Sequence, residues 1–178
     1  YKGEECMKRF LYTIFSIFII LILMTMNVFA MPINPGDYTS VDLKSNLLPP
    51  TVKVSAAHES AKRRGDFFLN ADLIIMNNGG GDIGVFAKAY MSVPVDEVYI
   101  TIYLDRWDEG TERWRQVSYY DAEFYAKDYP NGLSEPDVDI IFKNQERGYY
   151  YRLRGVFAAV LDDKFEGFSP VTDGIMIK

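Results

Sequence analysis

Few side chains in this sequence are suited to nucleophilic or metal chemistry. His58 is the only histidine and Cys6 the only cysteine among the 178 residues. A Ser-His-Asp triad or a zinc site needs a histidine held by rigid surroundings, whereas His58 lies in a stretch without regular periodicity. We therefore expect an exposed histidine at position 58, and we predict no catalytic residue, no metal site and no cofactor.

Carboxylates offer a second kind of chemistry. They gather at two predicted turns, one with Asp105, Asp108, Glu109 and Glu112 and the other with Asp162 and Asp163. Two acids about 5–10 Å apart across a cleft can hydrolyse a glycosidic bond, and turn carboxylates can also bind calcium. The ligand spacing of a known calcium loop is missing, and acidic turns are ordinary on a protein surface. A small glycan-active hydrolase is therefore kept as an alternative.

Aromatic rings are the most suggestive feature. Tyr99 and Tyr103 alternate outward on one predicted strand, and Trp107 and Trp114 flank the turn that follows it. On an exposed sheet face such rings could stack on sugars or anchor a protein partner. The alternative is that they pack across strands or beneath the N-terminal stretch and stabilise the sheet. The predicted binding residues are these four rings and two nearby arginines, namely Tyr99, Tyr103, Trp107, Trp114, Arg152 and Arg154.

The elements that must position these residues are β-strands. Apolar side chains alternate with period two in seven segments, 67–75, 83–91, 98–104, 114–125, 140–142, 149–161 and 171–177. In the first segment Phe67, Leu69 and Leu73 fall on one face. Residues 77–81, Asn-Asn-Gly-Gly-Gly, tolerate positive φ and predict a hairpin. About seven strands spaced by turns, without a convincing amphipathic helix, predict an all-β, immunoglobulin-like antiparallel β-sandwich.

The predicted sandwich domain occupies residues 64–178, with an extended spacer over residues 31–63. Four prolines punctuate the spacer, and residues 51–57 within it could form a short edge strand. The combined length suits a single hydrophobic core.

Residues 7–30 have the pattern of a secretory signal peptide. A basic pair follows Met7, and an apolar run over residues 10–26 comes next, which is the usual order in such signals. Residues 27–30 end in side chains that a signal peptidase accepts, so we predict cleavage after Ala30 with Met31 as the new N-terminus. The rival interpretation is an uncleaved anchor, but at about 1.5 Å per residue the run spans only ~25 Å of a ~30 Å hydrocarbon core.

Residues 1–6 are predicted to be a spurious translated leader ahead of the true start. Residues 2–5 can be encoded by a purine-rich stretch that resembles a bacterial ribosome-binding site before the codon for Met7. The source is then bacterial, and everything after Ala30 lies outside the cell. Because Cys6 belongs to this leader, the exported part has no disulfide and must be stabilised by packing alone.

The net charge restricts the classes of ligand that we expect. The chain has 25 acidic residues against 19 basic ones, with a formal net charge of −6. An acidic surface disfavours nucleic acid and anionic cell-wall polymers. A glycan or a protein is the expected ligand, and membrane contact is expected only through an uncleaved N-terminal segment.

Two resemblances support export and fold. Residues 149–155, followed by 166–170, resemble the last two strands of fibronectin type III domains, in which a tyrosine opening the penultimate strand hydrogen-bonds to backbone and anchors a corner. A longer set of strand and turn positions (64–67, 79–83, 95–98, 102–104, Trp114 and 149–150) resembles an uncharacterised, domain-of-unknown-function family of small secreted proteins from clostridia and related gut bacteria. This second resemblance implies export and fold, but no activity.

The sequence as a whole predicts an exported β-sandwich that acts as a non-catalytic extracellular binding or interaction module. The alternatives are a small secreted glycan-active hydrolase and a signal-anchored structural protein of the cell surface. The expected location is secreted or extracellular, and cell-surface associated if the signal is not cleaved.

Overall fold

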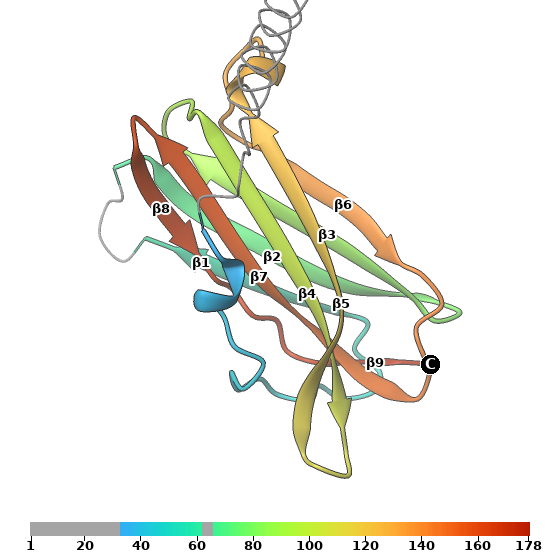
Figure 1. Cartoon of the computed structure of the whole chain (residues 1–178). Coiled ribbons are helices and arrows are strands. Elements are labelled where there is room, and N and C mark those ends of the chain that lie inside the picture. Colours follow the sequence, from blue (N-terminus) through green and yellow to red (C-terminus); the bar gives the residue numbers. More distant parts are fainter. Residues whose placement is uncertain (1–32, 62–65) are drawn as a thin grey trace, which may run out of the picture. The chain divides into compact units, whose positions relative to one another are not determined.

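Antiparallel strands make up nearly all of the regular structure. The computed structural model describes residues 33–61 and 66–178, and Asn34–Lys178 form one compact unit. These described residues contain nine strands, two short 3-10 helices and no α-helix (Figure 1). The predicted leader, signal peptide and cleavage site lie outside them. No helix in the described ranges is long and apolar enough to cross a membrane.

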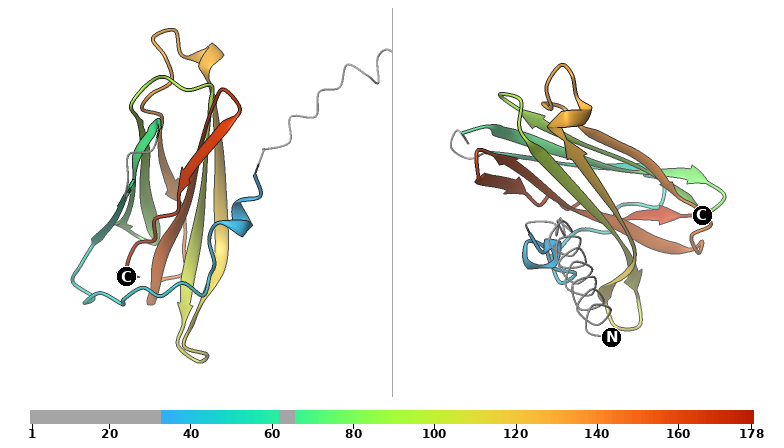
Figure 2. Two further views of the ribbon diagram at one scale, coloured as in Figure 1. Left: turned by 90° about the vertical axis from the view of Figure 1, so that its left-hand side faces the viewer. Right: turned by 45° about the horizontal axis from the view of Figure 1, so that its top comes forward.

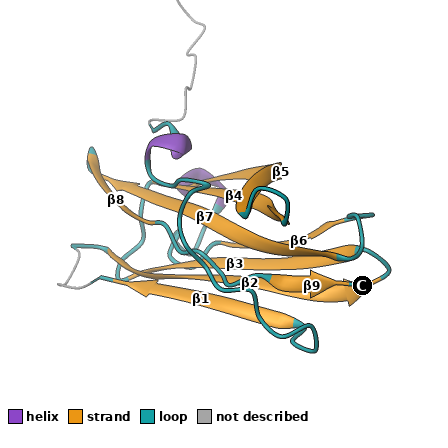
Figure 3. Cartoon of the chain, turned by 90° about the horizontal axis from the view of Figure 1, so that it is seen from below, coloured by secondary structure: helices purple, strands orange, loops and turns teal. Residues whose placement is uncertain are grey.

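Two sheets face each other as a β-sandwich (Figure 3). The four-stranded sheet has the order β1 (Val54–Ser60), β2 (Phe68–Gly79), β3 (Asp82–Met91) and β6 (Asp137–Phe142). The five-stranded sheet has the order β5 (Arg113–Tyr125), β4 (Glu97–Asp108), β7 (Tyr149–Leu161) and β8 (Lys164–Phe168), and β9 (Ile175–Ile177) also pairs with β7. Every pairing is antiparallel. The predicted all-β antiparallel sandwich is therefore confirmed, with nine strands where about seven were expected.

The core lies between the sheets and follows the predicted alternation with one exception. Leu73 and Ile75 of β2 are fully buried, as are Ile100 and Ile102 of β4. Leu69, predicted to face inward, is instead 42% exposed, and Phe68 takes the buried position. The prediction was wrong because the register between β2 and β3 shifts between residues 68 and 70. Such an irregularity interrupts the alternation, so that the adjacent Phe67 and Phe68 are both buried and Leu69 faces outward, whereas the side chains from Ala71 onward keep the predicted face.

Two tight turns set the register of the hairpins. The predicted β2–β3 hairpin is confirmed, with positive φ at Gly79, Gly80 and Gly81. The β7–β8 turn places Asp162 and Asp163 at φ values of 47° and 62°, which is the left-handed conformation that two-residue hairpin turns require. Strand β8 was not among the segments predicted from alternation.

The N-terminal segment, residues 34–53, is part of the compact unit. After the short helix η1 (Pro35–Asp37) it runs along the outer side of the five-stranded sheet and then crosses to β1 (Figure 2). Leu47 forms a parallel bridge with Gly174 on the way. Strand β1 pairs with β2 along its whole length, at the sheet edge and a few residues later than the short strand expected over 51–57. The stretch predicted as a spacer therefore supplies both a strand and a cover for one sheet face.

Candidate binding site

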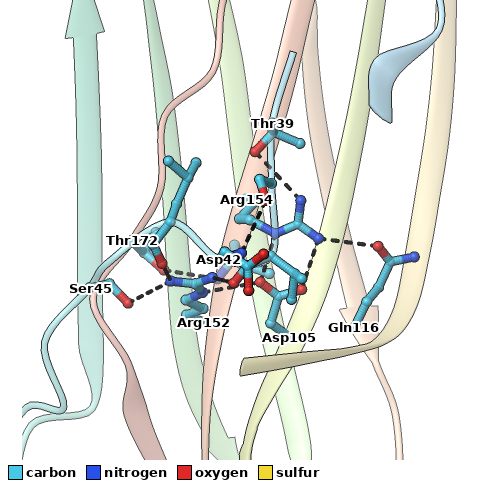
Figure 4. Close-up of polar contacts among 12 residues, drawn as sticks. Thr39, Asp42, Ser45, Asp105, Gln116, Arg152, Arg154 and Thr172 are labelled. Atoms are coloured by element: carbon cyan, nitrogen blue, oxygen red, sulfur yellow. Dashed lines mark hydrogen bonds and ion pairs between the residues drawn. The ribbon is translucent and has the colours of Figure 1, made fainter. Parts of the chain in front are cut away.

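A buried ion cluster lies on the outer face of the five-stranded sheet. Asp105 of β4 stands opposite Arg152 of β7 in the register, and Arg154 is two residues further along the same strand. The Asp105 carboxylate accepts hydrogen bonds from Arg154 Nε and Nη2 at 2.7 and 3.0 Å and from Arg152 Nε at 3.0 Å (Figure 4). All three side chains are at most 3% exposed. One carboxylate thus faces two guanidinium groups inside the protein.

The N-terminal segment supplies further hydrogen-bond acceptors for Arg152. Arg152 donates from Nη2 to the Val41 carbonyl at 2.7 Å, and from Nη1 to the Leu43 carbonyl and to Ser45 Oγ. Burial lowers the pKa of Arg152, and Asp105 opposes that shift. Because buried charges are costly unless they are paired and hydrogen-bonded, these bonds hold the segment against the sheet.

Aromatic rings flank the two arginines. The Arg152 guanidinium lies 4.5 Å from the ring centroid of Trp114, and that of Arg154 lies 4.7 Å from the Tyr103 ring. Both distances are within the range of cation–π attraction. Trp114 is only 7% exposed, and its indole packs so closely on Gly174 that a Cβ there would lie 2.6 Å from the ring. Trp114 is therefore a fixed part of the structure.

Trp107 extends this aromatic cluster to the surface. Its ring centroid lies 5.3 Å from that of Trp114 in an edge-on arrangement. The two indoles line the tryptophan groove, a cavity of about 700 Å³ between the N-terminal segment and the tip of the β4–β5 hairpin. The groove is lined by Val41, Asp42, Leu43, Lys44, Ser45, Asn46, Trp107, Glu112, Arg113, Trp114 and Asp173. It thus combines an aromatic wall with carboxylates, cations and an amide.

The tyrosines of the same face have different surroundings. Tyr99 is 5% exposed, donates to the Glu97 carboxylate and packs edge-on against Tyr125. Burial, followed by the bond to Glu97, raises the pKa of Tyr99. Tyr103 is half-buried and lies 6.5 Å from Tyr119, centroid to centroid. Neither Tyr99 nor Tyr103 lines the tryptophan groove.

The six predicted binding residues therefore share one sheet face but not one exposed surface. Trp107 and Trp114 line the groove, whereas Arg152, Arg154 and Tyr99 are buried. Among the rings, Trp114 is buried against Gly174, and Tyr99 packs on Tyr125 of the neighbouring strand, whereas both arginines bond the N-terminal segment. Sequence reasoning did not find the groove residues Asp42, Lys44, Asn46 and Asp173. Asp42, Lys44 and Asn46 come from the N-terminal segment, and Asn46 is joined to Asp173, 127 residues away, by hydrogen bonds from its backbone and side-chain amides.

The other chemistry-bearing residues are engaged in local contacts. Asp108 accepts a hydrogen bond from Arg115 Nε at 2.6 Å, and this bond, with smaller help from Thr111, lowers the pKa of the Asp108 carboxyl. His58 is exposed, as expected, but it lies on β1 instead of an irregular stretch, and its Nδ1 is 2.5 Å from Asp72 Oδ1. Within residues 33–61 and 66–178, histidine and acidic side chains form no cluster of three that could hold a metal ion.

Comparison with known proteins gives no match, neither to a protein-family model nor to a curated protein. The relationship to small secreted proteins therefore stays a prediction from the sequence. The geometry of the tryptophan groove is the main guide to function.

Proposed function

We propose that this chain is an exported, non-catalytic binding module that holds a glycan in the tryptophan groove. The observation that carries the proposal is the partly exposed Trp107 ring beside polar groups of both charges. A volume of about 700 Å³ lies within the usual range for small-ligand sites, which combine aromatic walls with a few polar groups. Sugar rings offer C–H faces to an indole and hydroxyl groups to carboxylates and amides.

The acids give the alternative of a glycan hydrolase little support. A general acid needs a pKa raised toward the working pH. Asp105 is instead fully buried between two arginines, and the pKa of Asp108 is lowered by Arg115. Glycoside hydrolysis uses two facing carboxylates, and of the four acids around the β4–β5 turn only Glu112 lines the groove. The other lining carboxylates are Asp42 and Asp173, and Asp173 accepts hydrogen bonds from Asn46.

Export is the second part of the proposal and rests on the basic and apolar pattern of residues 7–26. It predicts a secreted protein that begins at Met31. Mass spectrometry of culture supernatant should find that N-terminus, and recovery of the intact chain only in membranes would point to the anchored alternative.

A glycan array tests the binding function. The suitable fragment is 31–178, because Asn34–Lys178 form one compact unit with its own core. We expect binding to a restricted set of glycans, reduced about tenfold or more by Trp107→Ala, since a central aromatic contact is commonly worth over 1 kcal/mol. Tyr119→Ala is the matched control, because Tyr119 is 61% exposed on the same sheet face but outside the groove. Equal losses in both variants, or no binding at all, would contradict the proposal.

A further inference from the structure

The side of the sandwich formed by β5 and β6 is open. Strand β5 pairs with β4 alone, and β6 pairs with β3 alone. The two are therefore edge strands of different sheets, and both border the same side of the unit (Figure 1). Strand β5 is 13 residues long and β6 only six. An edge of that length presents a row of unpaired backbone groups that can accept another strand.

A groove with an apolar floor separates these two edges. It has a volume of about 490 Å³ and is lined by residues 120–124 of β5 and 137–140 of β6. Tyr120, Ala122 and Phe124 stand on the inner face of β5, since Tyr120 and Ala122 pair with the fully buried Ile102 and Ile100. Tyr120 is nevertheless 39% exposed, and Phe124 is only partly buried. The core is therefore incompletely covered along this edge groove.

Carboxylates form both rims of the edge groove. Asp121 and Glu123 alternate with the floor residues on β5, and Asp137 and Asp139 do so on β6. All four are exposed. The residues that line the groove include no lysine or arginine. Apolar and acidic side chains therefore alternate with period two along β5 and along β6. The side chains of an extended ligand strand have the same period.

We propose that the edge groove binds an extended, basic segment of another protein by strand addition to β5. In this mode, main-chain hydrogen bonds supply affinity and alternate side chains supply specificity. Apolar side chains of the segment would cover Ala122 and Phe124, and its lysines or arginines would reach the carboxylates on the rims. Charge complementarity selects this occupant over a second copy of the chain, because two such edges would bring like charges together. The proposal is independent of the tryptophan groove.

A displayed library of random ten-residue peptides, selected against fragment 31–178, tests the proposal. We expect the selected peptides to alternate apolar residues with lysine or arginine. The variant Asp137→Lys/Asp139→Lys should weaken their binding about tenfold or more. It changes only exposed side chains of β6, so the fold should be kept, as circular dichroism can verify.

The matched control is Asp37→Lys/Glu109→Lys. It makes the same change in net charge at exposed residues of η1 and of the β4–β5 turn that do not line the edge groove, and it should alter binding by less than about twofold. Amide exchange in β5 should slow when a selected peptide is bound, which identifies the edge that is used. Selection of peptides without basic residues, equal weakening in both charge variants, or unchanged exchange in β5 would each overturn the proposal.

Discussion

Asp105 is the residue on which the outer face of the five-stranded sheet most depends. It is the acidic partner of two buried arginines, both of which also bond the N-terminal segment. Buried charges are costly unless they are paired and hydrogen-bonded. Loss of Asp105 leaves a buried pair of like charges, which is more harmful than loss of an ordinary surface acid.

The variant Asp105→Asn should lower the free energy of unfolding by about 3–5 kcal/mol, the usual cost of removing one partner of a buried ion pair. Urea unfolding followed by fluorescence measures it. The control is Asp108→Asn, three residues away, whose pair with Arg115 is at the surface and should matter far less. Similar losses of unfolding free energy in the two variants would show that the buried cluster stabilises the fold no more than a surface ion pair does.

Tyr99 should make the free energy of unfolding decrease at alkaline pH. Burial and the bond to Glu97 raise its pKa above the ordinary value of 10.0, so the folded state retains a proton that the unfolded state releases. The contribution of Tyr99 to the free energy of unfolding should therefore be constant below about pH 10 and fall as the pH rises above it. Tyr99→Phe should make this fall less steep, as urea unfolding at about pH 8 and about pH 11 can show. An unchanged pH dependence would contradict the assignment.

At the scale of elements, the start of β7 is anchored by a corner. Tyr151 Oη donates to the Glu146 carbonyl at 2.9 Å. The ring itself is 1% exposed and belongs to the core. The hydroxyl thus links the loop before β7 to the sandwich.

Tyr151→Phe should cost about 0.5–1.5 kcal/mol, because it removes one hydrogen bond while keeping the buried ring. Thermal and urea unfolding both measure the change. Tyr150→Phe, on the neighbouring and partly exposed position, should have a smaller effect. A larger loss at Tyr150 would mean that the corner bond is not what stabilises this turn.

The alternation of apolar side chains was enough to predict most strands. Features that depend on contacts between residues distant in the sequence could not be predicted from it. Alternation was sufficient for β3, β4 and β7, because each side chain's face follows from its own strand. It failed at Leu69, where a register shift against β3 decides the face. The burial of Arg152 could not be derived in this way, since its carbonyl partners Val41 and Leu43 are 111 and 109 residues away in the chain.

The candidate site was predictable only in part for the same reason. The two tryptophans could be predicted to lie close together, because they flank the turn of the β4–β5 hairpin, whose strands are adjacent in sequence. The opposite wall of the groove comes from the N-terminal segment, which carries no periodic pattern. A stretch interpreted as a spacer therefore completes the site.

At the scale of the whole molecule, one packed sandwich supports two exposed surfaces. The sandwich and its buried ion cluster hold the tryptophan groove at one end of the β4–β5 hairpin, and the edge groove lies along β5 and β6. Both surfaces are proposed binding sites, and the net charge of −6 favours neutral or basic partners.

Nuclear magnetic resonance of the indole groups tests the central claim most directly. The chain has two tryptophans, so fragment 31–178 should show two indole N–H signals, which Trp107→Phe assigns. Titration with a glycan selected on the array should shift the Trp107 signal strongly and the buried Trp114 signal less. Saturable glycan binding that leaves both indole signals in place would contradict the assignment of the tryptophan groove as the binding site.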